Sequence, residues 1–331
     1  MSITGKLEPG LDVNRLLADA RAGDGDAFQA LVVPHLRAMH LHCYRMLGSY
    51  ADAEEAVQEA TVRAWRGLGG YQGTSPLRHW LYRIATTTCL KMINRRGRDP
   101  LASAAGVAWL QPYPDALLDR LSDADTDPAA VVERRESVAL AFVAALQLLP
   151  ATQRAALILR EVLSWPAREV ADLLDTTVPA VNSALQRARA TLASAPALDT
   201  GPRPLSPHEQ RVLDGFLRAW HACDIPALAA LLRDDVTLTM PPQAIQIVGR
   251  DAVAGFFATV PANGRLDRIR LVVTRANGHP ALAAYLPDGG DWECRGYGIM
   301  VLTLAGDQVA TIVGFPDADL FPLFELPATA P

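Results

Sequence analysis

Five polar or basic side chains between residues 182 and 189 could hydrogen-bond to nucleic acid. They are Asn182, Ser183, Gln186, Arg187 and Arg189. Amide and guanidinium groups bond to base edges in the major groove, and hydroxyl and basic groups also reach phosphates. The chemistry that these residues indicate is DNA recognition, provided that a helix holds them together on one side.

A recognition helix needs a second helix to support it, and the residues before position 175 predict one. Pro166 suits the first turn of that helix, where the N–H that proline lacks would have no partner in any case. Asp175 and Thr176 then predict a turn, because aspartate tolerates the left-handed backbone that a tight turn can require. The inner face of this first helix is apolar: Val170, Leu173 and Leu174.

The recognition helix itself has signals at its start and along its buried side. Thr177 can cap it, and Pro179 suits its first turn. Its apolar residues step by three and four, as a buried stripe requires: Val178, Val181, Leu185, Ala188 and Leu192. Pro166–Arg189 therefore predicts a helix-turn-helix, with an ordinary helical hairpin as the alternative.

Composition places these helices in a multidomain protein that we expect to be cytoplasmic. The 331 residues are half hydrophobic, which suffices for two or three cores. No apolar run reaches the roughly 18–20 residues that span a bilayer, and residues 1–10 do not resemble a signal peptide. The four cysteines are isolated in sequence, which gives no support for a zinc or redox motif. We expect no cofactor, no metal and no membrane.

Charge and periodicity divide the chain. Residues 12–96 have helical spacing, with breaks at residues 22–25, 48–49 and 67–76. Residues 35–98 are basic overall, whereas residues 99–137 are acidic and contain four prolines, Pro100, Pro112, Pro114 and Pro128. Trp109, Leu110 and Tyr113 suggest that this linker docks on another part of the protein. Helical spacing resumes at residues 129–192, before a proline-rich hinge.

The C-terminal part has a different pattern. Helical spacing at 207–222 and 226–232 gives way to strand-like alternation at 236–240 and 269–273. Segments 296–304 and 307–314 are rich in β-branched residues and are separated by a Gly-Asp turn. The sequence therefore predicts an α+β domain with a mostly antiparallel sheet.

The helix-turn-helix and the residues before it resemble region 4 of sigma-70-family RNA polymerase sigma factors, of the extracytoplasmic-function type. Leu148-Leu149-Pro150, Gln153-Arg154, Leu159-Arg160-Glu161 and the run Asn182–Arg189 carry the resemblance. The family's usual glycine in the turn is Asp175 here. The resemblance implies that this region docks on the polymerase β flap and reads the −35 promoter element through Thr177, Pro179, Asn182, Ser183, Gln186, Arg187 and Arg189.

An upstream segment, Asp52–Trp65, independently resembles region 2 of the same family. Its inner stripe is apolar: Ala53, Ala56, Val57, Ala60 and Ala64. Asp52, Glu55 and Glu59 are expected to form an acidic outer stripe, which the resemblance implies docks on the β′ clamp helices of core polymerase. An exposed acidic stripe favours a basic partner, although a solvated face is the alternative for the stripe alone.

The segment Tyr71–Arg98 resembles the part of region 2 that captures a flipped −10 base. Flipping costs a few kcal/mol, so the site needs a polar loop and cationic contacts to the single strand. The residues implied are Gln72, Thr74, Ser75, Arg78, Trp80, Tyr82, Arg83, Lys91, Arg95 and Arg96. Trp80 and Tyr82 could instead pack against Leu77, Leu81 and Ile84.

The two resemblances predict a sequence of domains. Region 2 spans 12–98, an acidic linker 99–130, region 4 131–195, a hinge 196–206 and a further α+β domain 207–331. The resemblance implies that the acidic linker enters the polymerase channel that RNA later occupies. The expected partners are core RNA polymerase and promoter DNA.

The domain at 207–331 resembles SnoaL-like domains, which are small α+β cones with an internal pocket. The pattern of elements, the run Gly249–Val253 and the closing run Phe315–Pro327 carry this resemblance. Residues that could line a pocket for a small ligand are Trp220, Met240, Phe256, Phe257 and Tyr285. Related cones include cyclases and isomerases, but His221, Asp235 and Asp291 are acid–base candidates by residue type only, so we expect no enzyme activity. The apolar segment Leu320–Leu326 is expected to dock near the domain junction.

The leading hypothesis is a sigma factor with a fused regulatory domain. A cyclase-like or isomerase-like enzyme with a DNA-binding module, and a conventional helix-turn-helix repressor, are the alternatives. Neither alternative needs the acidic segment Asp52–Trp65 or the basic helix that follows it.

Overall fold

The computed structural model describes residues 13–96, 110–122, 139–193, 205–287 and 294–330. The chain divides into two compact units. The N-terminal unit contains residues up to 47, 51–98 and 150–188, and the C-terminal unit contains residues 48–50, 99–149 and 189–331. Residues of the sequence-predicted linker and the start of predicted region 4 thus belong to the same unit as the C-terminal domain.

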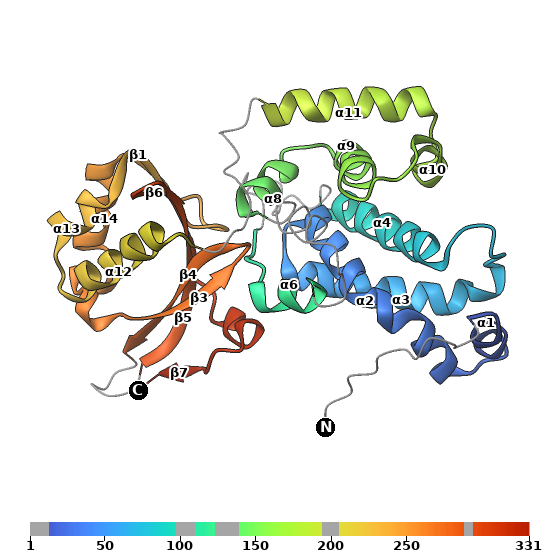
Figure 1. The fold of residues 1–331 in the computed structure, drawn as a ribbon, viewed down its shortest axis with the longest axis horizontal. Helices are drawn as coiled ribbons and strands as arrows, with labels where there is room; N and C mark the ends of the chain where they lie inside the picture. The colour runs from blue at the N-terminus through green and yellow to red at the C-terminus, as the bar shows by residue number, and fades with distance from the viewer. Residues whose placement is uncertain (1–12, 97–109, 123–138, 194–204, 288–293, 331) are drawn as a thin grey trace. The chain divides into compact units, whose positions relative to one another are not determined.

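The N-terminal unit is helical (Figure 1). Its first part contains α1 (Val13–Arg21), α2 (Gly25–Leu47), α3 (Tyr50–Gly67), the short helix η1 (Leu68–Gly70) and α4 (Leu77–Arg96). Its second part contains α9 (Ala151–Leu157), the π-helical turn η2 (Ile158–Val162), α10 (Ala167–Leu173) and α11 (Val178–Ala193), whose last residues belong to the C-terminal unit. The ends of α1, α2 and α3 fall at the three breaks expected from sequence.

The core of the N-terminal unit holds a neutral histidine. His42 is fully buried in α2, and its Nε2 lies 2.8 Å from the hydroxyl of Thr86. That hydroxyl donates its proton to the Tyr82 carbonyl at 2.7 Å, so Nε2 must be the donor to Thr86. Burial, with a smaller contribution from Arg45, lowers the pKa of His42 to about 3.

We expect acid to destabilise this unit through His42. Below about pH 6.5 the unfolded chain binds a proton at this histidine that the folded chain does not, so stability falls as pH drops towards 3. The loss between pH 8 and pH 5 should be about 2 kcal/mol. Urea unfolding at the two pH values measures it, and His42→Gln should remove most of the difference whereas the exposed His221→Gln should not. An unchanged difference in His42→Gln would contradict the assignment.

The C-terminal unit is built on a curved seven-stranded sheet (Figure 1). The strands are β1 (Leu232–Thr239), β2 (Gln246–Val248), β3 (Arg270–Ala276), β4 (His279–Pro287), β5 (Cys294–Ala305), β6 (Gln308–Phe315) and β7 (Thr329–Ala330). Their order is β2-β1-β6-β5-β4-β3, with β7 beside β5. All neighbours are antiparallel except β1 and β6. The mostly antiparallel sheet agrees with the sequence prediction.

Helices cover the sheet and short segments complete it. Helices α12 (Pro207–His221), α13 (Ile225–Ala230) and α14 (Arg250–Thr259) contribute to one hydrophobic cluster with β1, β3 and β6. The short helices η3 (Pro261–Gly264) and η4 (Leu266–Arg268) follow α14, and η5 (Ala318–Phe324) packs on β5. The apolar segment from Leu320 is therefore docked, and a Cβ added to Gly296 would lie 2.8 Å from the Phe321 ring.

Two further helices of this unit come from the middle of the chain. They are α6 (Asp115–Ser122) and α8 (Leu140–Gln147). Leu140 is buried in a cluster with Ile299 and Phe315 of the sheet, and Leu110 packs against the same cluster. None of the helices in the described residues combines the length and apolar character needed to cross a membrane. Those residues also contain no group of three His, Cys, Asp or Glu side chains that could bind a metal ion.

Candidate nucleic-acid interface and C-terminal pocket

The helix-turn-helix forms as its capping residues predict. Asp175 adopts a left-handed backbone, with φ of 51°, and the Thr177 hydroxyl accepts a hydrogen bond from the Ala180 amide at 3.3 Å. Pro166 is the N-cap of α10 and so lies just before its first turn. The buried side of α11 consists of Val181, Ala184, Leu185 and Ala188.

Two residues of the expected buried stripe lie elsewhere. Val178 is 37% exposed and Leu192 is half-buried, because they lie at the two ends of α11, whereas Ala184 is buried near its middle. All seven residues expected to read the −35 element are exposed along α11 and its cap: Thr177, Pro179, Asn182, Ser183, Gln186, Arg187 and Arg189. The geometry thus leaves these side chains accessible to DNA.

The residues expected to bind −10 DNA lie on α4 and on the loop before it. Gln72 and Thr74 are exposed in the loop, whereas Ser75 is half-buried and its carbonyl accepts the Tyr71 hydroxyl at 2.6 Å. The side chain of Arg96 lies outside the described residues. The other basic residues of the set are exposed on α4: Arg78, Arg83, Lys91 and Arg95.

The two aromatic residues of α4 are not equally accessible. Trp80 is half-buried against Tyr71, with 5.1 Å between ring centroids. Tyr82 is only 5% exposed and packs between His42 and Trp165, at 5.1 and 6.1 Å. In this conformation Tyr82 could stack on a base only after Trp165 moves away.

Helix α4 also contacts the helix-turn-helix. His79 stacks on Trp165 with 4.3 Å between centroids, and its Nδ1 lies 2.8 Å from a carboxylate oxygen of Glu169. Arg83 donates to the Asp172 carbonyl at 2.6 Å. Helix α10 therefore packs against α4 within the N-terminal unit, and the side of α4 that it covers becomes accessible only when α10 leaves it.

The acidic surface of α3 is smaller than expected. Glu55 and Glu59 are exposed beside the basic residues of α4, and Glu55 lies 3.8 Å from Arg95. Asp52, however, is only 8% exposed, so our expectation that it is part of the exposed stripe is wrong. Asp52 precedes Ala56 by one helical turn, which places it on the side of α3 that packs on the core. The alanines of the inner stripe are fully buried.

A segment of the expected linker is bound to the C-terminal sheet. The β3–β4 hairpin turns through Asn277-Gly278, both with positive φ. The amide of Asn277 donates to the Tyr113 carbonyl at 2.8 Å, its side-chain oxygen accepts the Tyr113 amide at 2.7 Å, and Pro114 forms a β-bridge with Ala276. Hairpin tips are usually exposed, but this one is buried.

Asp115 supplies the charged part of this contact. One carboxylate oxygen accepts the Gly278 amide at 2.7 Å, and the other accepts Arg275 Nε at 3.1 Å. Burial raises the pKa of Asp115, while the Gly278 amide and Arg275 act in the opposite direction. Arg120 of α6 pairs with Glu325 as a further contact. We call Tyr113–Asp115 with Arg275–Gly278 the linker clamp.

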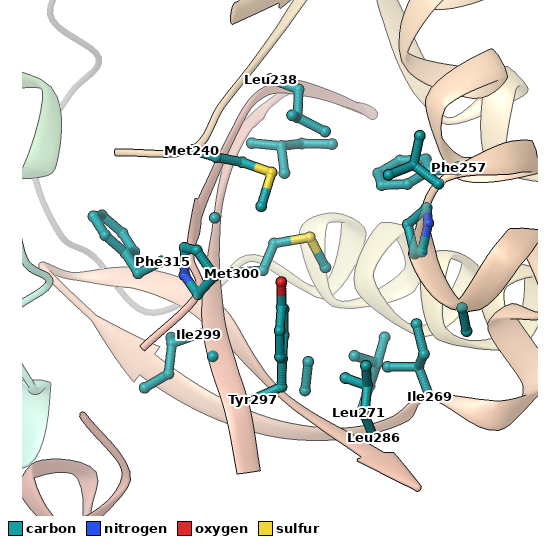
Figure 2. A pocket seen from close by; sticks show the side chains of 18 of the residues that line it. Leu238, Met240, Phe257, Ile269, Leu271, Leu286, Tyr297, Ile299, Met300 and Phe315 are labelled. Carbon is teal, nitrogen blue, oxygen red and sulfur yellow. The ribbon is translucent and has the colours of Figure 1, made fainter. Parts of the chain in front are cut away.

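The C-terminal sheet and its helices enclose an apolar pocket (Figure 2). Its volume is about 290 Å³, and residues from α12, α14, β1 and β3 to β6 line it. Four of the five pocket residues expected from sequence are among them, namely Trp220, Met240, Phe256 and Phe257. Tyr285 is not, because it points to the other side of β4, where it packs on Phe321 and donates to the Pro327 carbonyl at 3.0 Å.

The acid–base candidates do not meet at this pocket. His221 is exposed on α12, and Asp235 is exposed and paired with Arg233 at 2.8 Å. Asp291 lies outside the described residues. Neither described candidate is among the lining residues. A molecule bound in the pocket would therefore not contact either side chain.

Comparison with known proteins identifies three regions of this chain. Residues 31–99 match the family model described as Sigma-70 region 2, and residues 139–192 match Sigma-70, region 4. Residues 213–312 match the SnoaL-like domain. These matches follow the order in which the helical and α+β parts occur.

Curated relatives and a solved structure extend the similarity over most of the chain. ECF RNA polymerase sigma factor SigG of Mycobacterium tuberculosis is 42% identical over 328 residues, which cover 94% of this chain and 86% of the relative. SigJ of the same organism is 33% identical over 225 residues, covering 64% of this chain and 66% of SigJ. The crystal structure of SigJ superposes with a TM-score of 0.61 at 24% identity, over 89% of this chain and 99% of SigJ, and so supports the fold.

Proposed function

Because the chain belongs to the extracytoplasmic-function family of RNA polymerase sigma factors, we propose roles for its exposed surfaces and for its third domain. The exposed face of α11 reads the −35 element while region 4 docks on the β flap. The loop before α4 and the basic residues of α4 bind the −10 strand. Glu55 and Glu59 dock on the β′ clamp helices. These contacts belong in the cytoplasm, where polymerase and promoter are.

The third domain regulates the sigma factor by holding its linker. This proposal rests on the linker clamp. The clamp holds Tyr113–Asp115, which belong to the linker that the family resemblance assigns to the polymerase channel. The same residues cannot lie in that channel and against the β3–β4 turn. Engagement of polymerase therefore requires Asp115 to leave Gly278 and Arg275.

The energy of the clamp suits a reversible contact. A hydrogen bond to a charged group contributes about 1.5–3 kcal/mol, and Asp115 accepts two such bonds in a buried setting. Polymerase has to supply only a few kcal/mol to displace the linker, a range that binding partners commonly reach. A third domain that binds the linker in this way competes with polymerase for the linker and needs no catalytic activity.

The contact of α11 with promoter bases can be tested by removing the amide side chain of Gln186. We expect Gln186→Ala to weaken binding of polymerase that contains this sigma factor to its promoter by about 1–3 kcal/mol, roughly 5-fold to 150-fold, because a base contact is lost. Gln210→Ala is the matched control, since Gln210 is exposed on α12 and its side chain bonds Asp214 of the same helix. Equal effects of the two substitutions would contradict the assignment to α11.

The assignment as a whole is tested by reconstitution. The purified full chain is added to core polymerase that lacks any sigma factor, and transcripts are mapped on genomic DNA. We expect initiation at a defined set of promoters, with transcripts that Gln186→Ala reduces. A chain that joins core polymerase but starts transcription no more selectively than core alone would contradict the proposed promoter contacts.

A further inference from the structure

The pocket of the C-terminal domain has an almost wholly apolar wall. None of its lining residues in the described part of the chain carries a charge. The indole N–H of Trp220 is already bonded to the Ile269 carbonyl at 3.3 Å. Placing an ion there without a partner would be costly, so the wall selects against charged ligands.

One polar group remains at the pocket. Figure 2 shows the Tyr297 side chain directed into the pocket, with its hydroxyl towards the centre. Tyr297 is 47% exposed, and none of the described residues hydrogen-bonds its hydroxyl. The hydroxyl lies where it can donate to, or accept from, a single polar group on a bound molecule.

Two methionines and two aromatic residues of the pocket lining suit it to a ring-containing ligand. Met240 and Met300 point into the pocket (Figure 2), and methionine adapts to irregular shapes and makes favourable contacts between its sulfur and aromatic rings. Phe257 and Trp220 also line the pocket and pack edge to face, with centroids 5.4 Å apart. Such walls suit a flat ring system.

We propose that this pocket binds a small, uncharged, ring-containing molecule with one hydrogen-bonding group, and that its occupancy changes the hold of the domain on the linker. The second part rests on the proposed function. Ile299 and Phe315 both line the pocket, but their side chains point away from its centre (Figure 2) and pack in the cluster that contains Leu140. A ligand that shifts β5 and β6 at these two positions would also move the packing of Leu140 and Leu110, which lie on either side of Tyr113–Asp115 in the sequence.

A pair of dyes tests the ligand class on the full chain. Phenylnaphthylamine is uncharged, and anilinonaphthalene sulfonate has the same ring skeleton with an added negative charge. We expect the uncharged dye to bind saturably with enhanced fluorescence, and the sulfonate to bind at least about tenfold more weakly because its charge would be buried without a partner. Equal binding of the two dyes would overturn the proposed ligand class.

Variants locate the binding site. Ala284→Phe should fill the pocket and abolish binding of the uncharged dye, whereas Val248→Phe, at an exposed position of β2, should leave it unchanged. Tyr297→Phe removes only the hydroxyl and should weaken binding by about fivefold, which keeps the test valid if Ala284→Phe does not fold. Binding that persists in folded Ala284→Phe, or is unaffected by Tyr297→Phe, overturns this site.

Amide exchange at Gly278 separates the two parts of the proposal. Saturation with the uncharged dye should change the exchange rate of this amide, which the linker clamp protects. If the dye binds and the rate does not change, the coupling is overturned and the site stands. If the dye does not bind, the site is overturned, while protection of Gly278 in the dye-free chain still tests the clamp.

Discussion

A covalent lock on the linker clamp should abolish promoter-dependent transcription until it is reduced. Pro114 and Ala276 face each other across a β-bridge, and residues paired in this way lie close enough for a disulfide. Oxidised Pro114→Cys/Ala276→Cys protein cannot release the linker, so core polymerase should bind it poorly and start few transcripts. Reduction should restore both activities, because reduction frees the linker again.

Matched controls make the lock specific. Each single cysteine variant should be active under oxidising and reducing conditions. Cys43 and Cys89 are buried, whereas Cys223 and Cys294 are half-buried, so all variants carry Cys223→Ser and Cys294→Ser to prevent adventitious pairing. The readout is run-off transcription from one promoter, with the disulfide verified by mass spectrometry. Full activity of the oxidised double variant would show that the linker need not leave the C-terminal domain.

Reversing the charge of Glu55 and Glu59 should weaken binding to core polymerase about 30-fold or more, since close charge pairs at interfaces couple by about 1–2 kcal/mol each or more. Both glutamates are exposed on α3, so Glu55→Lys/Glu59→Lys should fold normally. Affinity is measured by fluorescence anisotropy of labelled protein titrated with core polymerase.

The same helix provides a control of equal charge change. Glu54 is also exposed on α3. Because it is the neighbour of Glu55 in sequence, its side chain points in a different direction around the helix axis. The single substitutions Glu59→Lys and Glu54→Lys change net charge equally, yet only the first should reduce affinity markedly. If they are equivalent, attraction to core polymerase depends on overall charge and α3 does not dock in the expected orientation.

The sequence predicted the local features of the fold well. Asp175 and Thr177 marked the turn and the cap because their side chains act on backbone within a few residues of themselves. The helix breaks before residue 77 followed from glycine and proline for the same reason. The burial of Asp52 could also have been read from its spacing to Ala56.

Features that depend on distant parts of the chain were not predictable in this way. Strand β4 was missed because its alanines and two prolines lack the usual strand signal, and it is held by β3 and β5 on either side. The Asn277-Gly278 pair is a strong hairpin signal that could have revealed it. That Asp115 binds this turn was not predictable, because 163 positions separate it from Gly278.

Amide exchange at Gly278 tests the central claim, that the third domain holds the linker and polymerase releases it. In a two-residue hairpin the amide of the second turn residue has no partner within the hairpin, so protection of Gly278 reports its bond to Asp115. We predict slow exchange in the free protein and fast exchange once it is bound to core polymerase. Slow exchange that persists in a transcriptionally active complex would contradict this claim.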